Sequence, residues 1–326
     1  MTQRQLQKLL VYLSKDYVIF GPEKLEGRLL IQKIRNPKRF KLTNKKPLYS
    51  HKNFLIPSSQ TLFNYDKDKF SKPKIKRKQV LIGIPIYDLK AFTLLHQVFE
   101  KDAYFQEIIR NTILIGHSPV PEKTTFYEKF ERNVLEHLKF DIFLEFKPRG
   151  EFRVFTGSED GQRILEKVGI KDYDHVEYAG AVPEEGLTKQ DISKFDLVKK
   201  SKNVKIWKEL GKKCLACGKC SLVCPTCFCF NIDDQPSFVR KQGKRVRNWS
   251  VCFYEEFSEI AGGEKFLKTI QDRIYNWYEH KFVRIPQEYN LPGCVGCGRC
   301  IEVCPAGIDL RKTFKELKKY FKNKKL

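Results

Sequence analysis

Two stretches of the 326-residue chain repeat the same arrangement of four cysteines, C-x2-C-x2-C-x3-C, each followed by a proline. They read Cys214-Leu-Ala-Cys217-Gly-Lys-Cys220-Ser-Leu-Val-Cys224-Pro225 and Cys294-Val-Gly-Cys297-Gly-Arg-Cys300-Ile-Glu-Val-Cys304-Pro305. Three thiolates at this spacing can surround one face of an iron–sulfur cubane, whereas the fourth is aimed away from it. The repeat therefore predicts two [4Fe–4S] clusters and one-electron chemistry.

In two-cluster ferredoxins the fourth cysteine of such a motif ligates the other cluster. We therefore expect a crossed assignment, in which one cluster is held by Cys214, Cys217, Cys220 and Cys304, and the other by Cys294, Cys297, Cys300 and Cys224. Gly218 and Gly298 stand at equivalent places in the two motifs, where a missing Cβ atom would let the backbone approach the cluster sulfides.

Other uses of the cysteines fit the sequence less well. A zinc site needs four ligands in total, so two complete quartets exceed its requirement. Disulfide-dense proteins are short and secreted, whereas this chain has 326 residues. Arg4 and Lys8 also interrupt the apolar segment that a signal peptide would need near the start of the sequence. The best apolar run, residues 80–86, is too short to span a bilayer. The sequence thus predicts a soluble, cytoplasmic protein whose thiols stay reduced.

Strands and helices are predicted to alternate ahead of all eleven cysteines. Strands are expected at residues 17–20, 29–34, 80–86, 112–116, 140–146 and 152–155, with a turn at Gly21-Pro22. Helices are expected from Thr2 to Leu13 and at about residues 89–110, 126–138 and 160–168. Such alternation predicts an α/β domain over residues 1–185, with residues 66–78 as a solvated linker.

A helical connector is expected at residues 186–211, followed by a loop-rich, ferredoxin-like two-cluster domain over residues 212–326. A 69-residue insert separates its two motifs. Asp309 is a candidate N-cap for a final helix, whose apolar stripe consists of Leu310, Phe314, Leu317 and Phe321. This stripe would either pack on the cluster domain or dock a partner subunit.

The insert carries several short motifs besides the cysteine repeats. They are Cys-Pro-Thr-Cys-Phe-Cys at residues 224–229, Trp-Ser-Val-Cys at 249–252, Ala-Gly-Gly at 261–263 and His-Lys-Phe at 280–282. Together with the second cysteine motif they resemble the iron–sulfur beta subunit of cytoplasmic nickel–iron sulfhydrogenases, a family that includes the related iron–sulfur subunit of anaerobic sulfite reductase. The resemblance is specific over about residues 205–310 and weaker before them.

This resemblance implies an electron-transfer subunit rather than a catalytic one. It would connect a flavoprotein subunit, which reacts with NAD(P)H or ferredoxin, with a catalytic subunit that reduces protons, sulfur or sulfite. No flavin is expected on this chain, because no glycine-rich nucleotide-binding motif opens a helix. The segment at residues 157–161 carries two acidic residues and is better explained as a helix start capped by Ser158.

Three cysteines of the insert, Cys227, Cys229 and Cys252, have no place in the two quartets. They could form a further metal site completed by a group such as His280, since C-x-C can chelate one metal edge. They could instead be buried apolar residues, or a transient redox pair. Four aromatic residues near them are expected to shield the clusters from water, namely Trp249, Tyr275, Trp277 and Tyr278.

The net charge of +23 is concentrated near the two ends of the sequence. Residues 1–78 contain 20 Lys/Arg and five Asp/Glu, and residues 309–326 contain eight and two. Such segments can bind an acidic protein, an anionic membrane surface or nucleic acid, or reflect a Lys-rich thermophile surface. No nucleic-acid-binding motif accompanies the charge. Two alternatives to an electron-transfer subunit stay open. One is a self-contained reductase that binds flavin or substrate in its α/β domain, and the other is a nucleic-acid-binding protein in which the clusters only stabilise the fold.

Overall fold

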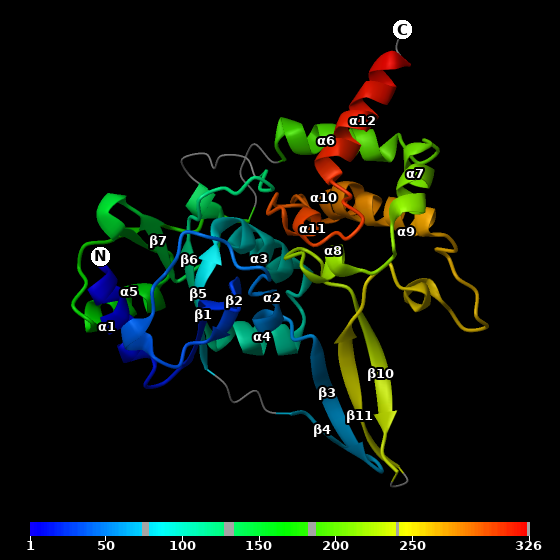
Figure 1. The fold of residues 1–326 in the computed structure, drawn as a ribbon. Helices are drawn as coiled ribbons and strands as arrows, with labels where there is room; N and C mark the ends of the chain where they lie inside the picture. Colours follow the sequence, from blue (N-terminus) through cyan, green and yellow to red (C-terminus); the bar gives the residue numbers. More distant parts are fainter. Residues whose placement is uncertain (74–77, 127–133, 182–186, 239–240, 325–326) are drawn as a thin grey trace. The chain divides into compact units, whose positions relative to one another are not determined.

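The chain folds into two compact units, seen in the computed structural model of Figure 1. The structure describes residues 1–73, 78–126, 134–181, 187–238 and 241–324. The first unit comprises residues 1–56 and 73–181, and the second comprises residues 57–72 and 182–326. All eleven cysteines belong to the second unit.

A mixed seven-stranded sheet forms the centre of the first unit, in the order β2-β1-β5-β6-β7-β8-β9. Its strands are β1 (Val18–Leu25), β2 (Arg28–Lys33), β5 (Gln79–Pro85), β6 (Thr112–His117), β7 (Ile142–Phe146), β8 (Phe152–Thr156) and β9 (Asp174–His175). Strands β1, β5, β6 and β7 are parallel, whereas β2 and β8 run antiparallel to their neighbours β1 and β7. Strand β5 is buried along its whole length, as its continuous apolar sequence predicts.

Three helices in this unit, α1 (Gln3–Leu13), α4 (Ala103–Arg110) and α5 (Glu159–Lys167), begin at a side chain that caps them. Thr2 forms a capping box with Gln5 at the start of α1, and the Ser158 hydroxyl accepts a hydrogen bond from the Gly161 amide at the start of α5. The remaining helical segments are η1 (Pro37–Arg39), α2 (Lys52–Leu55), α3 (Ile86–Val98), η2 (Val134–His137) and η3 (Pro148–Gly150). The predicted α/β architecture is confirmed.

Several predicted boundaries in this half of the chain are wrong. Strand β1 continues through Gly21-Pro22, and the turn lies instead at Glu26-Gly27, where both residues have positive φ. The single helix expected at residues 89–110 is two helices, because Asp102 caps α4 after a break. Most of the helix expected at residues 126–138 lies outside the described residues.

The second unit contains a four-stranded antiparallel sheet built from two distant parts of the sequence. Its order is β10-β11-β3-β4, with β3 (Ser59–Asp66), β4 (Lys69–Ser71), β10 (Phe230–Pro236) and β11 (Gln242–Trp249). Strand β3 pairs with β11, so that Thr61 lies opposite Val246. Residues 66–78 are therefore not simply a linker, since β4 lies among them.

Helices and helical turns are the other regular elements that the structure describes in the second unit. They are α6 (Lys189–Lys199), α7 (Ile206–Lys213), α8 (Lys219–Leu222), η4 (Glu255–Ser258), α9 (Ile270–Glu279), the π-helical turn η5 (His280–Arg284), α10 (Ile285–Tyr289), α11 (Arg299–Glu302) and α12 (Leu310–Asn323). Asp309 caps α12, and the stripe residues Leu310, Phe314 and Leu317 are buried within the unit. The ring of Phe314 contacts Tyr278 and Phe282, which confirms that this helix packs on the cysteine-rich part.

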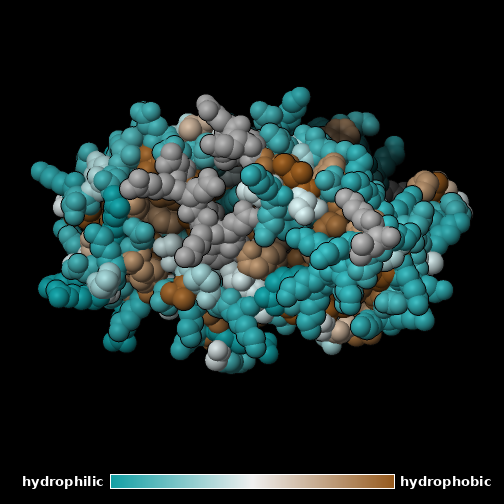
Figure 2. Space-filling model, turned by 90° about the horizontal axis from the view of Figure 1, so that it is seen from above, coloured by the Kyte–Doolittle hydropathy of each residue, from teal (hydrophilic) through white to brown (hydrophobic). Residues whose placement is uncertain are grey.

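Hydrophilic residues dominate the face shown in Figure 2, in agreement with the net charge of +23. Among the described residues, no helix combines the length and apolar character needed to cross a membrane.

Candidate metal centre

Both cysteine motifs adopt the same local structure, a loop that leads into a single helical turn. Gly218 precedes α8 with φ of 70°, and Gly298 precedes α11 with φ of 77°. This left-handed conformation favours glycine. At Gly218 a Cβ atom would also lie 2.6 Å from the Val251 side chain. Backbone conformation and close packing therefore account for the glycine that follows the second cysteine.

Backbone amides turn toward the cysteine sulfurs in these loops. The Ala216 amide donates to the Cys214 sulfur at 3.4 Å, and the Ile308 amide donates to the Cys304 sulfur at 3.3 Å. A backbone hydrogen bond from Gly296 likewise lowers the pKa of Cys294, although burial raises it overall. Amides in these positions stabilise a thiolate, the form that binds metal.

A first cavity of the second unit brings together cysteines of both motifs. Cys304 lines it with the first-motif residues Cys214, Cys217 and Cys220, and Cys300 also reaches its wall. Burial raises the pKa of Cys220 to about 12, and neighbouring cysteine sulfurs add to this rise. Four thiols in a largely apolar cavity fit an iron–sulfur cluster, because coordination to iron replaces the thiol protons.

The other four motif cysteines form a second group. Burial raises the pKa of Cys300 well above its usual range, and the charges of Cys297, Cys294 and Cys224 raise it further. Cys224 and Cys297 are themselves buried. The structure links Cys224 of the first motif to the start of the second, because one ammonium group, that of Lys281, donates hydrogen bonds both to the Cys224 sulfur and to the carbonyl of Gly293, the residue before Cys294.

A lysine that the cysteine spacing does not indicate lies at the second group. The ammonium group of Lys281 donates hydrogen bonds to the sulfur of Cys224, to the hydroxyl of Thr226 and to the carbonyl of Gly293, over 2.9 to 3.1 Å. Burial by itself would lower the pKa of Lys281, but Cys224, Cys227 and Cys294 raise it well above the usual value. Lys281 is therefore a buried cation.

The backbone around Lys281 is specialised for this position. Lys281 lies in the π-helical turn that follows α9, a feature often found at functional sites. A Cβ atom on Gly293 would lie 2.2 Å from the Lys281 carbonyl oxygen, so only glycine permits this approach of the two chain segments. In the sequence, Lys281 is visible only as part of the His-Lys-Phe motif.

A second cavity contains the three remaining cysteines. Cys227, Cys229 and Cys252 line it together with His280, and Trp277 lies in the wall of both cavities. Burial and the nearby Arg284 and Lys281 charges lower the pKa of His280 to about 4, so its imidazole is neutral at neutral pH. The structure therefore brings together all four residues that the sequence named for a possible further site.

The predicted aromatic wall is formed by part of the expected set. Trp277 and Tyr278 line the first cavity, where Phe253 joins them. Tyr275 instead contacts the ring of Trp207, with ring centres 5.4 Å apart, and Trp249 ends β11.

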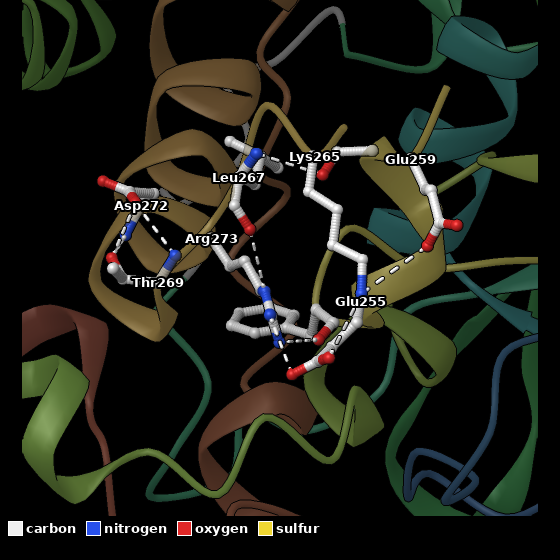
Figure 3. Close-up of polar contacts among 9 residues, drawn as sticks. Glu255, Glu259, Lys265, Leu267, Thr269, Asp272 and Arg273 are labelled. Atoms are coloured by element: carbon white, nitrogen blue, oxygen red, sulfur yellow. Dashed lines mark hydrogen bonds and ion pairs between the residues drawn. The ribbon is translucent and has the colours of Figure 1, made fainter. Parts of the chain in front are cut away.

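The loop that carries Cys252 and Phe253 is tied to α9 by Arg273. Figure 3 shows Arg273 beside Glu255 and Leu267. The buried Arg273 guanidinium donates to the carbonyls of Phe253 and Leu267, and it pairs with Glu255 at 3.2 Å. Lys265 joins Glu255 to Glu259 at the edge of this network. Arg273 thereby holds part of the cavity wall against the helix that supplies Trp277.

The chain is similar to known iron–sulfur proteins. Residues 213–308 match the model of the 4Fe-4S dicluster domain. The chain is 28% identical to sulfhydrogenase 2 subunit beta of Pyrococcus furiosus over 316 residues, which cover 92% of each protein. It is 24% identical over 144 residues to the pyruvate-flavodoxin oxidoreductase of Trichormus variabilis, a match that covers 44% of this chain and 10% of that protein. No solved structure matches the chain.

The resemblance expected from the motifs is thus confirmed. The dicluster domain, with its eight motif cysteines, implies two [4Fe–4S] clusters. The chain is an iron–sulfur protein, similar over nearly its whole length to a hydrogenase-related oxidoreductase subunit.

Proposed function

We propose that this chain is an electron-transfer subunit of a multisubunit oxidoreductase of the hydrogenase, sulfur reductase or sulfite reductase type. In this proposal Cys214, Cys217, Cys220 and Cys304 hold one cluster. Cys294, Cys297, Cys300 and Cys224 hold the other. When bound, each cluster takes up and releases single electrons.

The observation that carries the proposal is the composition of the first cavity. Cys304 lines it beside Cys214, and Cys300 of the other quartet lies in the same wall. Two quartets that share a wall would hold their clusters close to one another, which would suit passage of an electron between them. A cluster that only braces a fold needs no such neighbour.

The protein's own groups have defined roles in such a relay. The side chains of Trp277, Tyr278 and Phe253 exclude water from the first cavity and so lower its dielectric constant. Amide donors such as Ala216 and Ile308 stabilise negative charge on the sulfurs. Solvent exposure and hydrogen bonds to sulfur are the means by which proteins set cluster potentials.

The similarity to a sulfhydrogenase beta subunit supports a proposal about the partners. We propose a flavoprotein subunit that reacts with NAD(P)H or ferredoxin on one side, and a catalytic nickel–iron or sulfite-reducing subunit on the other. A cytoplasmic location accords with these partners.

The decisive experiment is anaerobic purification of the tagged chain from its own host, followed by identification of the proteins that accompany it. A nickel-containing subunit would indicate hydrogen chemistry, and a sirohaem protein would indicate sulfite chemistry. The purified chain should contain iron and acid-labile sulfide and show iron–sulfur absorption without flavin. Stoichiometric zinc without labile sulfide would refute the proposal, and bound flavin would favour a self-contained reductase.

A further inference from the structure

We propose that Cys227, Cys229 and Cys252, with His280 as the fourth ligand, bind a third iron–sulfur cluster in addition to the two of the dicluster motifs. The four residues come from three separate segments of the chain. Cys227 and Cys229 lie between α8 and β10, Cys252 follows β11, and His280 begins the π-helical turn. All four line the second cavity.

The packing of these cysteines differs from that of ordinary buried apolar residues. A thiol that serves only as a small apolar group is surrounded by close-packed side chains. Here three thiols and an imidazole instead line one cavity. Thiolate and neutral imidazole are both established ligands of iron in iron–sulfur clusters.

Two polar groups in the same cavity wall point to a ligand that accepts hydrogen bonds. The hydroxyl of Ser221 and the indole nitrogen of Trp277 are buried, and within the described chain neither has a hydrogen-bond partner. Both residues line the cavity of Cys227, Cys229 and Cys252. Buried donors are normally satisfied. The sulfides and thiolates of a cluster would satisfy both.

The spacing of the ligands favours a cluster over a single ion. In the part of the chain that the structure describes, no three His, Cys, Asp or Glu side chains converge closely enough to hold one metal ion. The eight motif cysteines form no such group among the described residues either. Ligands of a cubane bind different iron atoms, so they lie farther apart than the four ligands of zinc.

The third site lies close to both cysteine quartets. Trp277 lines both this cavity and the one that contains the first quartet, and Ser221, which follows Cys220, lies in the wall beside Cys252. Lys281 lines the second cavity and donates a hydrogen bond to Cys224 of the second quartet. A cluster at this place would extend the relay from two centres to three.

The first test counts iron and sulfide in the full chain, reconstituted anaerobically. The wild type is expected to bind about 12 iron and about 12 sulfide. Cys229→Ser and Cys252→Ser should each reduce both numbers to about eight, while the paramagnetic signals of the two motif clusters persist. Phe230→Leu is the matched control, because it alters the residue next to Cys229 without removing a donor, whereas the ring of Phe228 contacts His280. It should retain the full complement.

The second test examines the histidine. His280→Cys should retain the third cluster but lower its reduction potential, because an anionic thiolate replaces a neutral imidazole. The reverse change, from cysteine to histidine ligation, raises the potential of Rieske centres. A purely structural role of His280 would not shift a cluster potential. If a serine variant fails to fold, the potential measured in His280→Cys still tests whether a third cluster is bound.

Several results would overturn the proposal. One is a wild-type content of about eight iron and eight sulfide. A second is the full iron content in Cys252→Ser. A third is one zinc per chain that is lost in the serine variants, and a fourth is a reversible disulfide between Cys227 and Cys229 without extra iron. None of these outcomes alters the evidence for the two motif clusters, so the test is independent of the proposed relay.

Discussion

The ammonium nitrogen of Lys281 lies 3.1 Å from the sulfur of Cys224, and both side chains are buried. A positive charge beside a cluster ligand stabilises the reduced, more negative state of that cluster. Water does not screen this charge as it would at the surface. Lys281 should therefore set the potential of the cluster that Cys224 ligates.

We expect Lys281→Met to lower the potential of that cluster by roughly 50 to 100 mV, which corresponds to about 1–2 kcal/mol for one electron at an effective dielectric constant near 20. Redox titration followed by electron paramagnetic resonance would measure the shift. Lys268→Met is the control, because Lys268 is largely exposed and pairs with the exposed Glu264. Equal potentials in wild type and Lys281→Met would exclude a tuning role.

The shared cavity of Cys304 and the first-motif cysteines makes a prediction about single variants. Cys304→Ala should damage the cluster of Cys214, Cys217 and Cys220, for instance by converting it to a three-iron form, and leave the other cluster intact. Cys224→Ala should do the reverse. The paramagnetic signals of both clusters in each variant would provide the test. If Cys304→Ala perturbs only the cluster of its own motif, the crossed assignment is wrong.

Arg273 should matter for retention of the first cluster. Arg273→Met leaves the carbonyls of Phe253 and Leu267 without their donor, a loss of about 1–3 kcal/mol. Because Phe253 lines the first cavity, iron should be released faster to a chelator, and the thermal midpoint should fall. Lys265→Met in the same network is the control, since exposed ion pairs contribute little. Equal release rates in both variants would count against this role.

The buried His117 makes stability of the first unit depend on pH. Burial lowers its pKa to about 3 from 6.5, so the folded state stays unprotonated at pH 5 while the unfolded chain binds a proton. Stability is thus fully present above pH 6.5 and declines as the pH falls, by at most about 2 kcal/mol between pH 6.5 and pH 5.

The prediction is checked by thermal unfolding at pH 7 and pH 5. His117→Asn should lose less stability than the wild type over this interval. The exposed His175→Asn, which serves as the control, should behave like the wild type. A fall in midpoint that is the same in His117→Asn and in the wild type would show that other groups dominate.

The basic ends of the sequence predict salt-sensitive assembly. Residues 309–326 contain eight Lys/Arg, and Lys315, Lys318, Lys319 and Lys322 are exposed on α12. If they dock an acidic partner, replacing these four by glutamine should slow association at low salt, and added salt should slow the wild type too. Stopped-flow or surface-binding kinetics with the copurifying partner would measure this. Association that is indifferent to salt would leave the charge as a property of a thermophile surface.

Local features of this protein could be inferred from the sequence because they depend on neighbouring residues. The cysteine spacing within residues 214–224 and 294–304 predicts two loops that present thiolates. Each of the capping residues Thr2, Ser158 and Asp309 bonds to a backbone amide in the first turn of the helix that follows it. Buried strands such as β5 and β6 followed from continuous apolar runs. The least reliable predictions were boundaries, as at Gly21-Pro22, because a strand can extend through a potential turn when its neighbours pair with it.

Only the tertiary structure decided which distant residues meet. Nothing in the sequence near Thr61 indicates that β3 pairs with β11, because the pairing depends on hydrogen bonds between segments nearly two hundred residues apart. Lys281 reaches Cys224 for the same reason. The place of Cys304 beside the first motif, by contrast, was expected from the pattern of two-cluster ferredoxins. Cys252 and His280 are separated by 28 residues and come together only because α9 and its π-helical turn fold back over the loop. The conformation of each cysteine motif depends on residues that are neighbours in the sequence. The cavities that these motifs line depend on the packing of distant segments.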